Sequence, residues 1–212
     1  MTLALADELF LMTHDIQSGK ARLSDPALGI GLSAALLSEL VFSGSLMLSN
    51  GQLLLGEYPP PNEHLAESLL DETRAQLYGG ELTVRNWLGA HRRIVLDLVA
   101  DRMAGAGELR REEQQRRLGR TVTRFYPLRP AEAFIRCQRI SSYLRHRVEI
   151  TAGDALLAAL LHIMAPGANL LELDDVGRGY LGEVVPLLPG PLAELLNQTE
   201  SAIQMALRNP SF

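Results

Sequence analysis

A single charged residue, Glu39, interrupts the longest apolar stretch of the chain, which covers residues 26–48. Asp25 before this stretch is a favourable N-cap, a proline follows at the first helical position, and Gly44 is a natural stop. We therefore expect a helix over residues 26–43, about 27 Å long at 1.5 Å per residue.

The position of Glu39 argues against a membrane span for this helix. A charge near the bilayer centre costs roughly 2.5–3.5 kcal/mol on insertion scales. The stretch also lacks a basic flank and an aromatic belt. We interpret the helix as the centre of a protein core.

Two later segments have the pattern of β-hairpins. Asn50 and Gly51 lie between two short apolar runs, which is the strongest local signal for a type I′ turn. Three prolines at 59–61 then predict an exposed, irregular loop. A second, arginine-rich hairpin is indicated around Gly119, which can turn the chain before the β-prone residues 121–126.

Helical periodicity accounts for most of the remaining chain. The expected helices are 3–13, 63–78, a segment capped near Thr83, 92–103, 131–147, 152–164, 169–184 and 191–207. The pattern predicts a mainly α protein. It would form a single globular domain over residues 1–212, built around a central apolar helix bundle, with one or two small β-hairpins.

Composition constrains the core and the compartment. The chain is 47% hydrophobic but only 5% aromatic, so the core must consist of Leu, Ala, Val and Ile, with the one tryptophan, Trp87, as an anchor. The one cysteine, Cys137, cannot form an internal disulfide, and we interpret it as an inert buried thiol of a reducing compartment. Because the N-terminus also lacks the features of a signal peptide, we expect a cytoplasmic protein.

The sequence contains no recognisable motif for catalysis. Its five histidines form no HxxxH or HxxE pair, and G-x-S-x-G does not occur. Gly29 and Gly31 lack the third glycine and the preceding strand of a dinucleotide loop, and favour close helix packing instead. We expect a protein that is not an enzyme, with no catalytic residue, metal site or cofactor.

Charge is distributed unevenly along the chain. Residues 85–147 hold 15 arginines and 6 acidic residues, which gives +9, and the rest holds 5 basic and 19 acidic residues, which gives −14. The sum is the net charge of −5. Either this basic segment presents a basic face to a polyanion, or it pairs with the acidic residues of the protein itself.

Arginine side chains bind phosphate oxygens with paired hydrogen bonds, so a lipid headgroup or a nucleic acid would fit the basic segment. Arg92 and Arg93 are expected to open a helix, and Arg136 and Arg139 share a face of a later one. The arginines in and beside the expected hairpin are Arg110, Arg111, Arg116, Arg117, Arg120 and Arg124. Four to six of these residues near an anionic leaflet, at roughly 1 kcal/mol each, would bind it weakly and reversibly.

A nucleic acid is the less favoured of these two partners. Its recognition usually adds exposed aromatic residues that stack on bases. The aromatic residues of this part of the chain are Phe125, Tyr126, Phe134 and Tyr143, and their spacing is that of core residues. The residues alone leave both a lipid surface and a nucleic acid open.

The order of six stretches resembles the Golgi phosphoprotein 3 family: "LALADELFLMTHD", "GLSAALLSELVFSGSL", "NWL", "RRIVLDLVADRMAGAGEL", "YPL" and "GDALLAALLHIM". Together they run over nearly the whole chain, and the second is the most specific. The family binds phosphatidylinositol-4-phosphate, retains glycosyltransferases in the eukaryotic Golgi and has many bacterial relatives. Of the 20 basic residues here 19 are arginine, a skew typical of GC-rich and often actinobacterial genomes.

This resemblance implies a mostly helical single domain that lies on a membrane and has the tail of a membrane protein as a further partner. It also implies a projecting hairpin, used in membrane contact or self-association, at about 112–124. A homo-oligomer would follow from the self-association. The hairpin residues that we expect to act are Arg116, Arg117, Leu118, Arg120 and Arg124.

The family's headgroup pocket falls on four positions of this chain. Its tryptophan before the core helix is here Ser24, and its arginine early in that helix is here Ser33. Its two basic residues one turn apart are here Arg93 and Leu96, with Arg92 beside them. Because an indole and two guanidinium groups are replaced, several charge-assisted bonds of about 1.5–3 kcal/mol each are lost. The resemblance therefore implies binding of general anionic lipid or another phosphorylated ligand by Arg92, Arg93, Ser24 and Ser33, in place of tight phosphatidylinositol-4-phosphate recognition.

Together these observations predict a non-enzymatic peripheral membrane adaptor that binds anionic phospholipid, phosphoinositides included, through a basic face. Two alternatives stay open. One is an adaptor that binds protein without touching lipid, and the other is a nucleic-acid-binding module.

Overall fold

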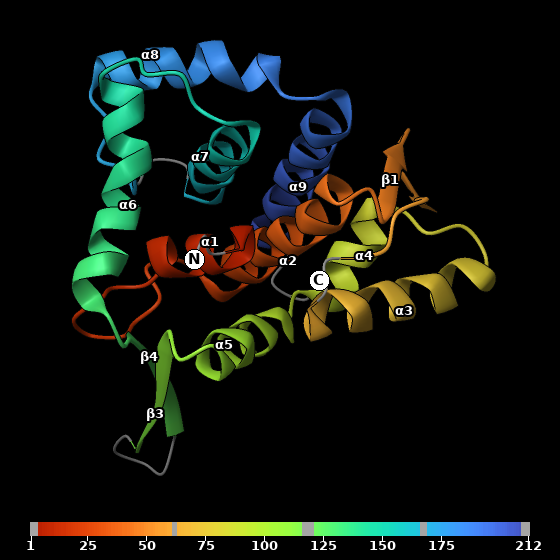
Figure 1. The fold of residues 1–212 in the computed structure, drawn as a ribbon, viewed down its shortest axis with the longest axis horizontal. Coiled ribbons are helices and arrows are strands. Elements are labelled where there is room, and N and C mark those ends of the chain that lie inside the picture. The colour runs from red at the N-terminus through yellow and green to blue at the C-terminus, as the bar shows by residue number, and fades with distance from the viewer. Residues whose placement is uncertain (1–3, 61–62, 116–120, 166–168, 209–212) are drawn as a thin grey trace.

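The computed structural model describes residues 4–60, 63–115, 121–165 and 169–208. Within these ranges the chain forms nine α-helices, one short 3-10 helix and two two-stranded antiparallel sheets. α2 lies near the centre of the molecule, and the two hairpins project from opposite ends of the molecule (Figure 1). The prediction of a mainly α fold with two small hairpins is confirmed.

The helices and strands have the following bounds, in their order along the chain. They are α1 (Leu5–Thr13), α2 (Asp25–Phe42), β1 (Leu46–Ser49), β2 (Gln52–Leu55), α3 (His64–Tyr78), α4 (Val84–His91), α5 (Val95–Gly105), β3 (Leu109–Gln115), β4 (Thr121–Pro127), α6 (Pro130–Arg145), α7 (Ala152–Met164), α8 (Asp175–Val184), η1 (Val185–Leu187) and α9 (Gly190–Arg208).

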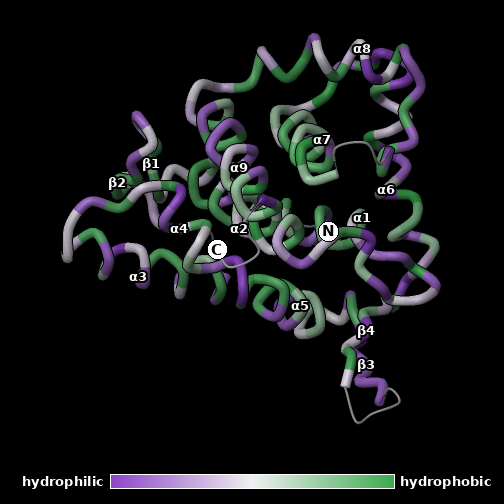
Figure 2. Tube along the Cα trace, turned by 180° about the vertical axis from the view of Figure 1, so that it is seen from behind, coloured by the Kyte–Doolittle hydropathy of each residue, from purple (hydrophilic) through white to green (hydrophobic). Residues whose placement is uncertain are grey.

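α2 is the core helix that the apolar pattern predicts. It contacts α1, α3, α4, α5, α7 and α9. In Figure 2 the tube of α7, which packs beside α2, is coloured as hydrophobic along most of its length. α2 is the one helix among the described residues that is long and apolar enough to cross a membrane, and 72% of that apolar window is buried inside the protein. This burial agrees with its interpretation as a core helix.

Two glycines let other elements approach α2 closely, as the sequence predicts. A Cβ atom at Gly29 would collide with the backbone carbonyl oxygen of Arg92, and one at Gly31 would collide with the side chain of Met164. Gly29 therefore brings the turn after α4 against α2, and Gly31 does the same for the end of α7.

The single charge of α2 is paired inside the protein. Nη1 of Arg102, on α5, lies 2.9 Å from Oε2 of Glu39. The N–H group of Ala6, in the first turn of α1, donates to Oε1 of Glu39 at 2.8 Å. A buried carboxylate requires partners of this kind. A charged residue in the core helix is thus explained by packing against α1 and α5.

Both hairpins occur where the sequence predicts them. Asn50 and Gly51 have φ angles of 50° and 75°, as a type I′ turn requires. β3 and β4 pair from Leu109 opposite Pro127 to Gln115 opposite Thr121, so this hairpin is longer than the predicted 112–124. It projects from the body of the protein beside α5 (Figure 1).

The predicted starts of α2 and α5 are wrong by one and by three residues. Ser24 is the N-cap of α2, because it has extended backbone angles, φ −68° and ψ 147°, whereas Asp25 is already helical. α5 begins at Val95, and residues 92–94 form a turn. The N–H of Ile94 donates to the carbonyl of the residue three before it, at 3.0 Å, which ends the α-helical bonding pattern of α4.

The predicted helix 169–184 begins only at Asp175. The side chain of Asn169 binds both the N–H and the C=O of Leu173, each at 2.8 Å, and so closes a loop that is not helical. Asp174 then caps α8 by accepting a hydrogen bond from the N–H of Gly177.

Candidate anion-binding site

Arg92 and Arg93 lie in the turn between α4 and α5, against the first turn of α2. They line a surface pocket of about 390 Å³. The other residues around it are Asp25, Pro26, Leu28, Gly29 and Leu96. We call this cavity the α2 N-terminal pocket. The fold therefore brings the two predicted arginines to the start of the core helix.

The turn that carries these arginines is anchored on both sides. On α4, the indole N–H of Trp87 donates to Oγ1 of Thr73 at 2.8 Å, and the ring stacks on His91 with centroids 4.0 Å apart. Trp87 is fully buried, which confirms its predicted role as a core anchor. On α5, Val95 and Val99 are also fully buried. Two fixed helices thus hold the intervening turn in one position.

The electrostatics of the α2 N-terminal pocket favour an anion. The charged residues that line it are Arg92, Arg93 and Asp25, which gives a net charge of +1. The first turn of α2 also presents the positive end of the helix dipole, although Pro26 has no N–H group and the N–H of Leu28 donates to the carbonyl of Ser24. Arg93 is exposed, and none of the ion pairs between described residues involves it.

The two predicted serines do not line this pocket. Ser24 is exposed and directly precedes α2. Ser33 is fully buried one turn after Gly29, and within the described ranges its hydroxyl has no hydrogen-bond partner. Since residues four apart share a helix face, Ser33 lies behind the pocket on the side of α2 that Gly29 presents to Arg92. Leu96 supplies an aliphatic wall.

Most of the residues that we expected to act in the second hairpin are not described by the structure. Arg116, Arg117, Leu118 and Arg120 lie outside the described residues. Arg124 is buried on β4, opposite Glu112 on β3, so it is not part of the exposed surface.

The expectation that the nearby aromatic residues belong to the core holds only in part. Phe125 is buried and meets Phe10 edge-on at a centroid distance of 5.2 Å. Phe134 is 57% exposed on α6, so the prediction is wrong for this residue.

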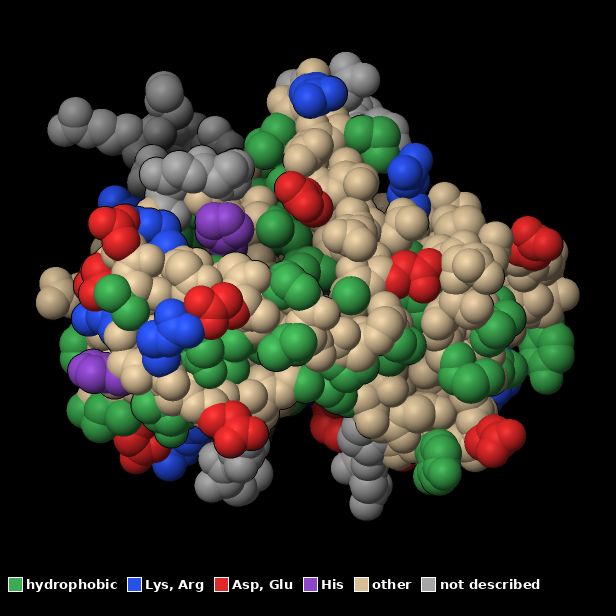
Figure 3. Space-filling model, turned by 90° about the horizontal axis from the view of Figure 1, so that it is seen from above, with side chains coloured by type: hydrophobic (Ala, Val, Ile, Leu, Met, Phe, Trp, Pro, Cys, Tyr) green, Lys and Arg blue, Asp and Glu red, His purple; other side chains and the backbone are tan. Residues whose placement is uncertain are grey.

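Much of the basic segment pairs with the acidic residues of the protein itself. Among its described residues, at least six arginines form ion pairs: Arg102, Arg110, Arg111, Arg129, Arg139 and Arg147. In the view of Figure 3, basic and acidic side chains are interspersed and form no face of one sign. The second of the two interpretations of the +9 segment therefore holds for these six residues.

Sequence reasoning missed the two buried ion-pair clusters. Arg102 binds Asp7 at 2.8 Å and Glu39 at 2.9 Å, and lies 3.5 Å from Glu63. Burial outweighs the attraction of Arg102 and raises the pKa of Asp7 to about 6. The available signal was a lone acidic residue within an apolar helix, which requires a buried partner.

The second cluster joins Glu8, on α1, and Asp154, on α7, through Arg139 on α6. The guanidinium of Arg139 donates to Asp154 at 2.8 Å and to Glu8 at 2.9 Å. Burial raises the pKa of Glu8, against the opposing effect of Arg139.

The described residues offer little other chemistry. Within the described ranges no group of three or more His, Cys, Asp or Glu residues could hold a metal ion. The side chain of Cys137 lies outside what the structure describes.

A family model described as Golgi phosphoprotein 3 matches residues 5–176. No curated protein matches the sequence. The matched range begins with α1 and reaches into α8, so it includes the α2 N-terminal pocket and both hairpins.

Proposed function

The chain belongs to the Golgi phosphoprotein 3 family, and from this premise we propose that it is a non-enzymatic peripheral membrane adaptor that binds anionic phospholipid headgroups in its α2 N-terminal pocket. The family is known for lipid-binding adaptors associated with the Golgi membrane. The observation that carries the proposal is the meeting of Arg92 and Arg93 with the first turn of α2.

The chemistry of this pocket suits a phosphate group. A guanidinium group donates two parallel hydrogen bonds to phosphate oxygens, and the positive end of the α2 dipole adds to the attraction. Asp25 in the same pocket opposes a high negative charge. Leu96 stands at the position of the second basic residue of the family's headgroup pocket. We therefore propose general anionic lipid as the ligand and not one phosphoinositide alone.

The second hairpin adds to this proposal as a membrane contact. Its arginines Arg116, Arg117 and Arg120, with Leu118, would then lie at the same lipid surface. Replacing the three arginines together by glutamine should weaken vesicle binding. If it does not, the hairpin contributes nothing to it.

Vesicle flotation of the full chain tests the proposal. Neutral phosphatidylcholine vesicles are compared with vesicles that also contain phosphatidylserine or phosphatidylinositol-4-phosphate, at low and at physiological salt. We expect flotation with both anionic sets, weaker at the higher salt. Flotation with phosphatidylinositol-4-phosphate alone would contradict general anionic recognition, and no flotation would contradict lipid binding.

A charge-matched pair of variants assigns the binding to the pocket. Arg92→Ala/Arg93→Ala removes two positive charges from it. Arg85→Ala/Arg208→Ala removes two from exposed positions outside it. The proposal predicts that only the first pair abolishes flotation. Equal loss in both would mean that net charge, and not the pocket, binds the membrane.

One observation favours a second function, the binding of a protein segment. Met47 and Leu54 are cross-strand partners on the first hairpin and are 47% and 46% exposed. The hairpin that carries this pair follows the C-terminal end of α2 (Figure 1), whereas Arg92 and Arg93 line the pocket at its first turn. An adaptor could hold the tail of a membrane protein there, and Met47→Asp should then abolish capture of such a tail without changing vesicle flotation.

A further inference from the structure

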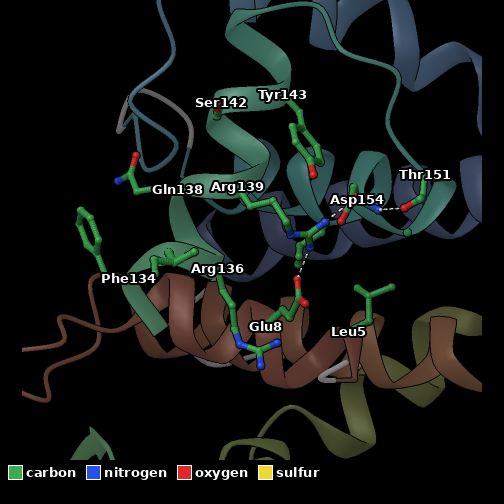
Figure 4. A pocket seen from close by; sticks show the side chains of 13 residues that line it. Leu5, Glu8, Phe134, Arg136, Gln138, Arg139, Ser142, Tyr143, Thr151 and Asp154 are labelled. Carbon is green, nitrogen blue, oxygen red and sulfur yellow. Dashed lines mark hydrogen bonds and ion pairs between the residues drawn. The ribbon is translucent and has the colours of Figure 1, made fainter. Parts of the chain in front are cut away.

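A second cavity, of about 930 Å³, lies between α1, α6 and α7 (Figure 4). It shares no lining residue with the α2 N-terminal pocket. Its volume is within the range of about 300–1,000 Å³ that is usual for small-molecule sites. We call it the α6–α7 cavity. Neither the family match nor the proposed lipid site assigns it a role.

The floor of this cavity carries an excess of negative charge. It is formed by Glu8, Arg139 and Asp154, two carboxylates with one guanidinium. Glu8 and Asp154 are only 8% and 7% exposed. Arg139 binds Oε2 of Glu8 and Oδ2 of Asp154, so the second oxygen of each carboxylate can accept a bond from another donor.

Two further polar groups define the surroundings of this floor. The Tyr143 hydroxyl points toward Arg139 and Asp154 (Figure 4), and the Tyr143 ring lies 5.9 Å from the Arg139 guanidinium. Arg136 lies beside Glu8, on the side facing α1 (Figure 4). Arg136 attracts Glu8, so the lining is neutral as a whole, and its negative end is at Asp154, which lies farther from Arg136 (Figure 4).

The walls and the rim of the cavity are apolar. Leu5 and Leu157 line it from α1 and α7. Phe134 and Ile135, consecutive on α6, also line it and are 57% and 67% exposed. Large apolar side chains left in water at the edge of a cavity gain free energy when a ligand covers them. The lining therefore suits a ligand with an apolar chain.

We propose that the α6–α7 cavity binds a single-chain amphiphile whose head is a primary ammonium group. The ammonium contacts the second oxygens of Glu8 and Asp154, and the chain lies along the apolar part of the lining. An ammonium carries three N–H donors, which match the two carboxylates and the Tyr143 hydroxyl. It also neutralises the excess charge of a floor that is shielded from water.

Two sources supply this head chemistry, a long-chain amine and a lysophospholipid with an ethanolamine head. Isothermal titration of the full chain, below the micelle concentration of each probe, compares dodecylammonium, dodecanoate, dodecyl maltoside and lauroyl-lysophosphatidylethanolamine. We expect saturable one-to-one binding of dodecylammonium, at least tenfold tighter than that of dodecanoate or the maltoside. Binding of the lysophospholipid in addition identifies the membrane as a source, and its failure to bind identifies a free amine.

Matched tryptophan variants locate the site. Ser142 lines the cavity, whereas Ser201 on α9 lies outside it, and both are exposed serines within helices. Ser142→Trp should weaken dodecylammonium binding at least tenfold, and Ser201→Trp should leave it unchanged. Circular dichroism and thermal unfolding check that both variants fold.

A third variant tests the role of the charge. Asp154→Asn keeps the shape of the side chain and makes the floor neutral. The preference for dodecylammonium over dodecanoate should then fall below threefold. The proposal is overturned if dodecanoate or the maltoside binds as tightly as dodecylammonium, if the two tryptophan variants behave alike, if Asp154→Asn keeps the preference, or if no probe binds saturably.

Discussion

Arg93 and Arg102 lie in the same basic segment but in opposite surroundings. The Arg102 side chain is 10% exposed and binds carboxylates from α1 and α2, with a third at the start of α3. Arg93 is exposed in a turn and faces the first turn of α2. The difference teaches that a run of arginines gives a net charge, whereas the fold decides which of them are available to a ligand.

Helix position explains this division. Residues 95, 99 and 102 lie on neighbouring turns of α5, and the valines at the first two are fully buried. Arg102 therefore enters the protein beside them, where lone acidic residues of apolar helices already require a partner. Arg93 precedes the helix and stays at the surface, where a pocket forms instead of an ion pair.

The largest expected effect is a loss of stability on replacing Arg102, which distinguishes this arginine from Arg93. Arg102→Met should lower the free energy of unfolding by about 3–5 kcal/mol, because it leaves buried carboxylates without their cation. Urea unfolding measures this loss. The folded fraction should still bind anionic vesicles like wild type. A loss below 1 kcal/mol, or the same loss in the exposed control Arg85→Met, would contradict the structural role of Arg102.

The pH dependence of stability tests the same cluster. The pKa of Asp7 is raised in the folded protein from 3.8 to about 6, so the folded state binds more protons than the unfolded state between these pH values. This contribution to stability is present below about pH 4 and is lost as the pH rises through 6. At 1.36 kcal/mol per pKa unit it amounts to about 3 kcal/mol.

Asp7→Asn removes this titration while keeping the side-chain shape. The stability of the variant relative to wild type should therefore improve between pH 4.5 and pH 7.5, by about 2 kcal/mol, because part of the titration lies below pH 4.5. Urea unfolding at both pH values measures it. A relative stability that stays constant would show that Asp7 titrates normally.

Gly29 connects the core helix to the surface site, so a substitution there should affect both stability and binding. In Gly29→Ala the new methyl group collides with the Arg92 carbonyl, which should cost about 1–3 kcal/mol and displace the turn that carries Arg93. Vesicle binding should weaken as well.

Gly89→Ala, on α4, is the matched control for Gly29→Ala. Nothing lies within 4 Å of its new Cβ atom, and it should stabilise the helix by about 0.5–1 kcal/mol. Equal stability of the two alanine variants would mean that α2 and the turn after α4 are not in close contact.

Local signals predicted the elements but not their partners. The Asn50–Gly51 turn, the Thr83 cap and the apolar run of α2 were readable because each depends on neighbouring residues. The start of α8 was missed because an asparagine side chain closes a loop before it.

The candidate site was predictable to a smaller extent. The sequence and the family resemblance indicated Arg92 and Arg93, and the structure brings both to one pocket. The carboxylate partners of Arg102 and of Arg139 could not be predicted. Glu39 and Glu8 lie on helices that are far away in the sequence from the arginines they bind.

The vesicle affinity of Arg93→Ala, measured with its free energy of unfolding, tests the central claim most directly. Because Arg93 is exposed, its stability should stay within about 0.5 kcal/mol of wild type. Its affinity for phosphatidylserine-containing vesicles should fall about fivefold, the equivalent of about 1 kcal/mol for one basic residue near an anionic surface. Unchanged affinity would contradict the assignment of the α2 N-terminal pocket as the site that meets the membrane.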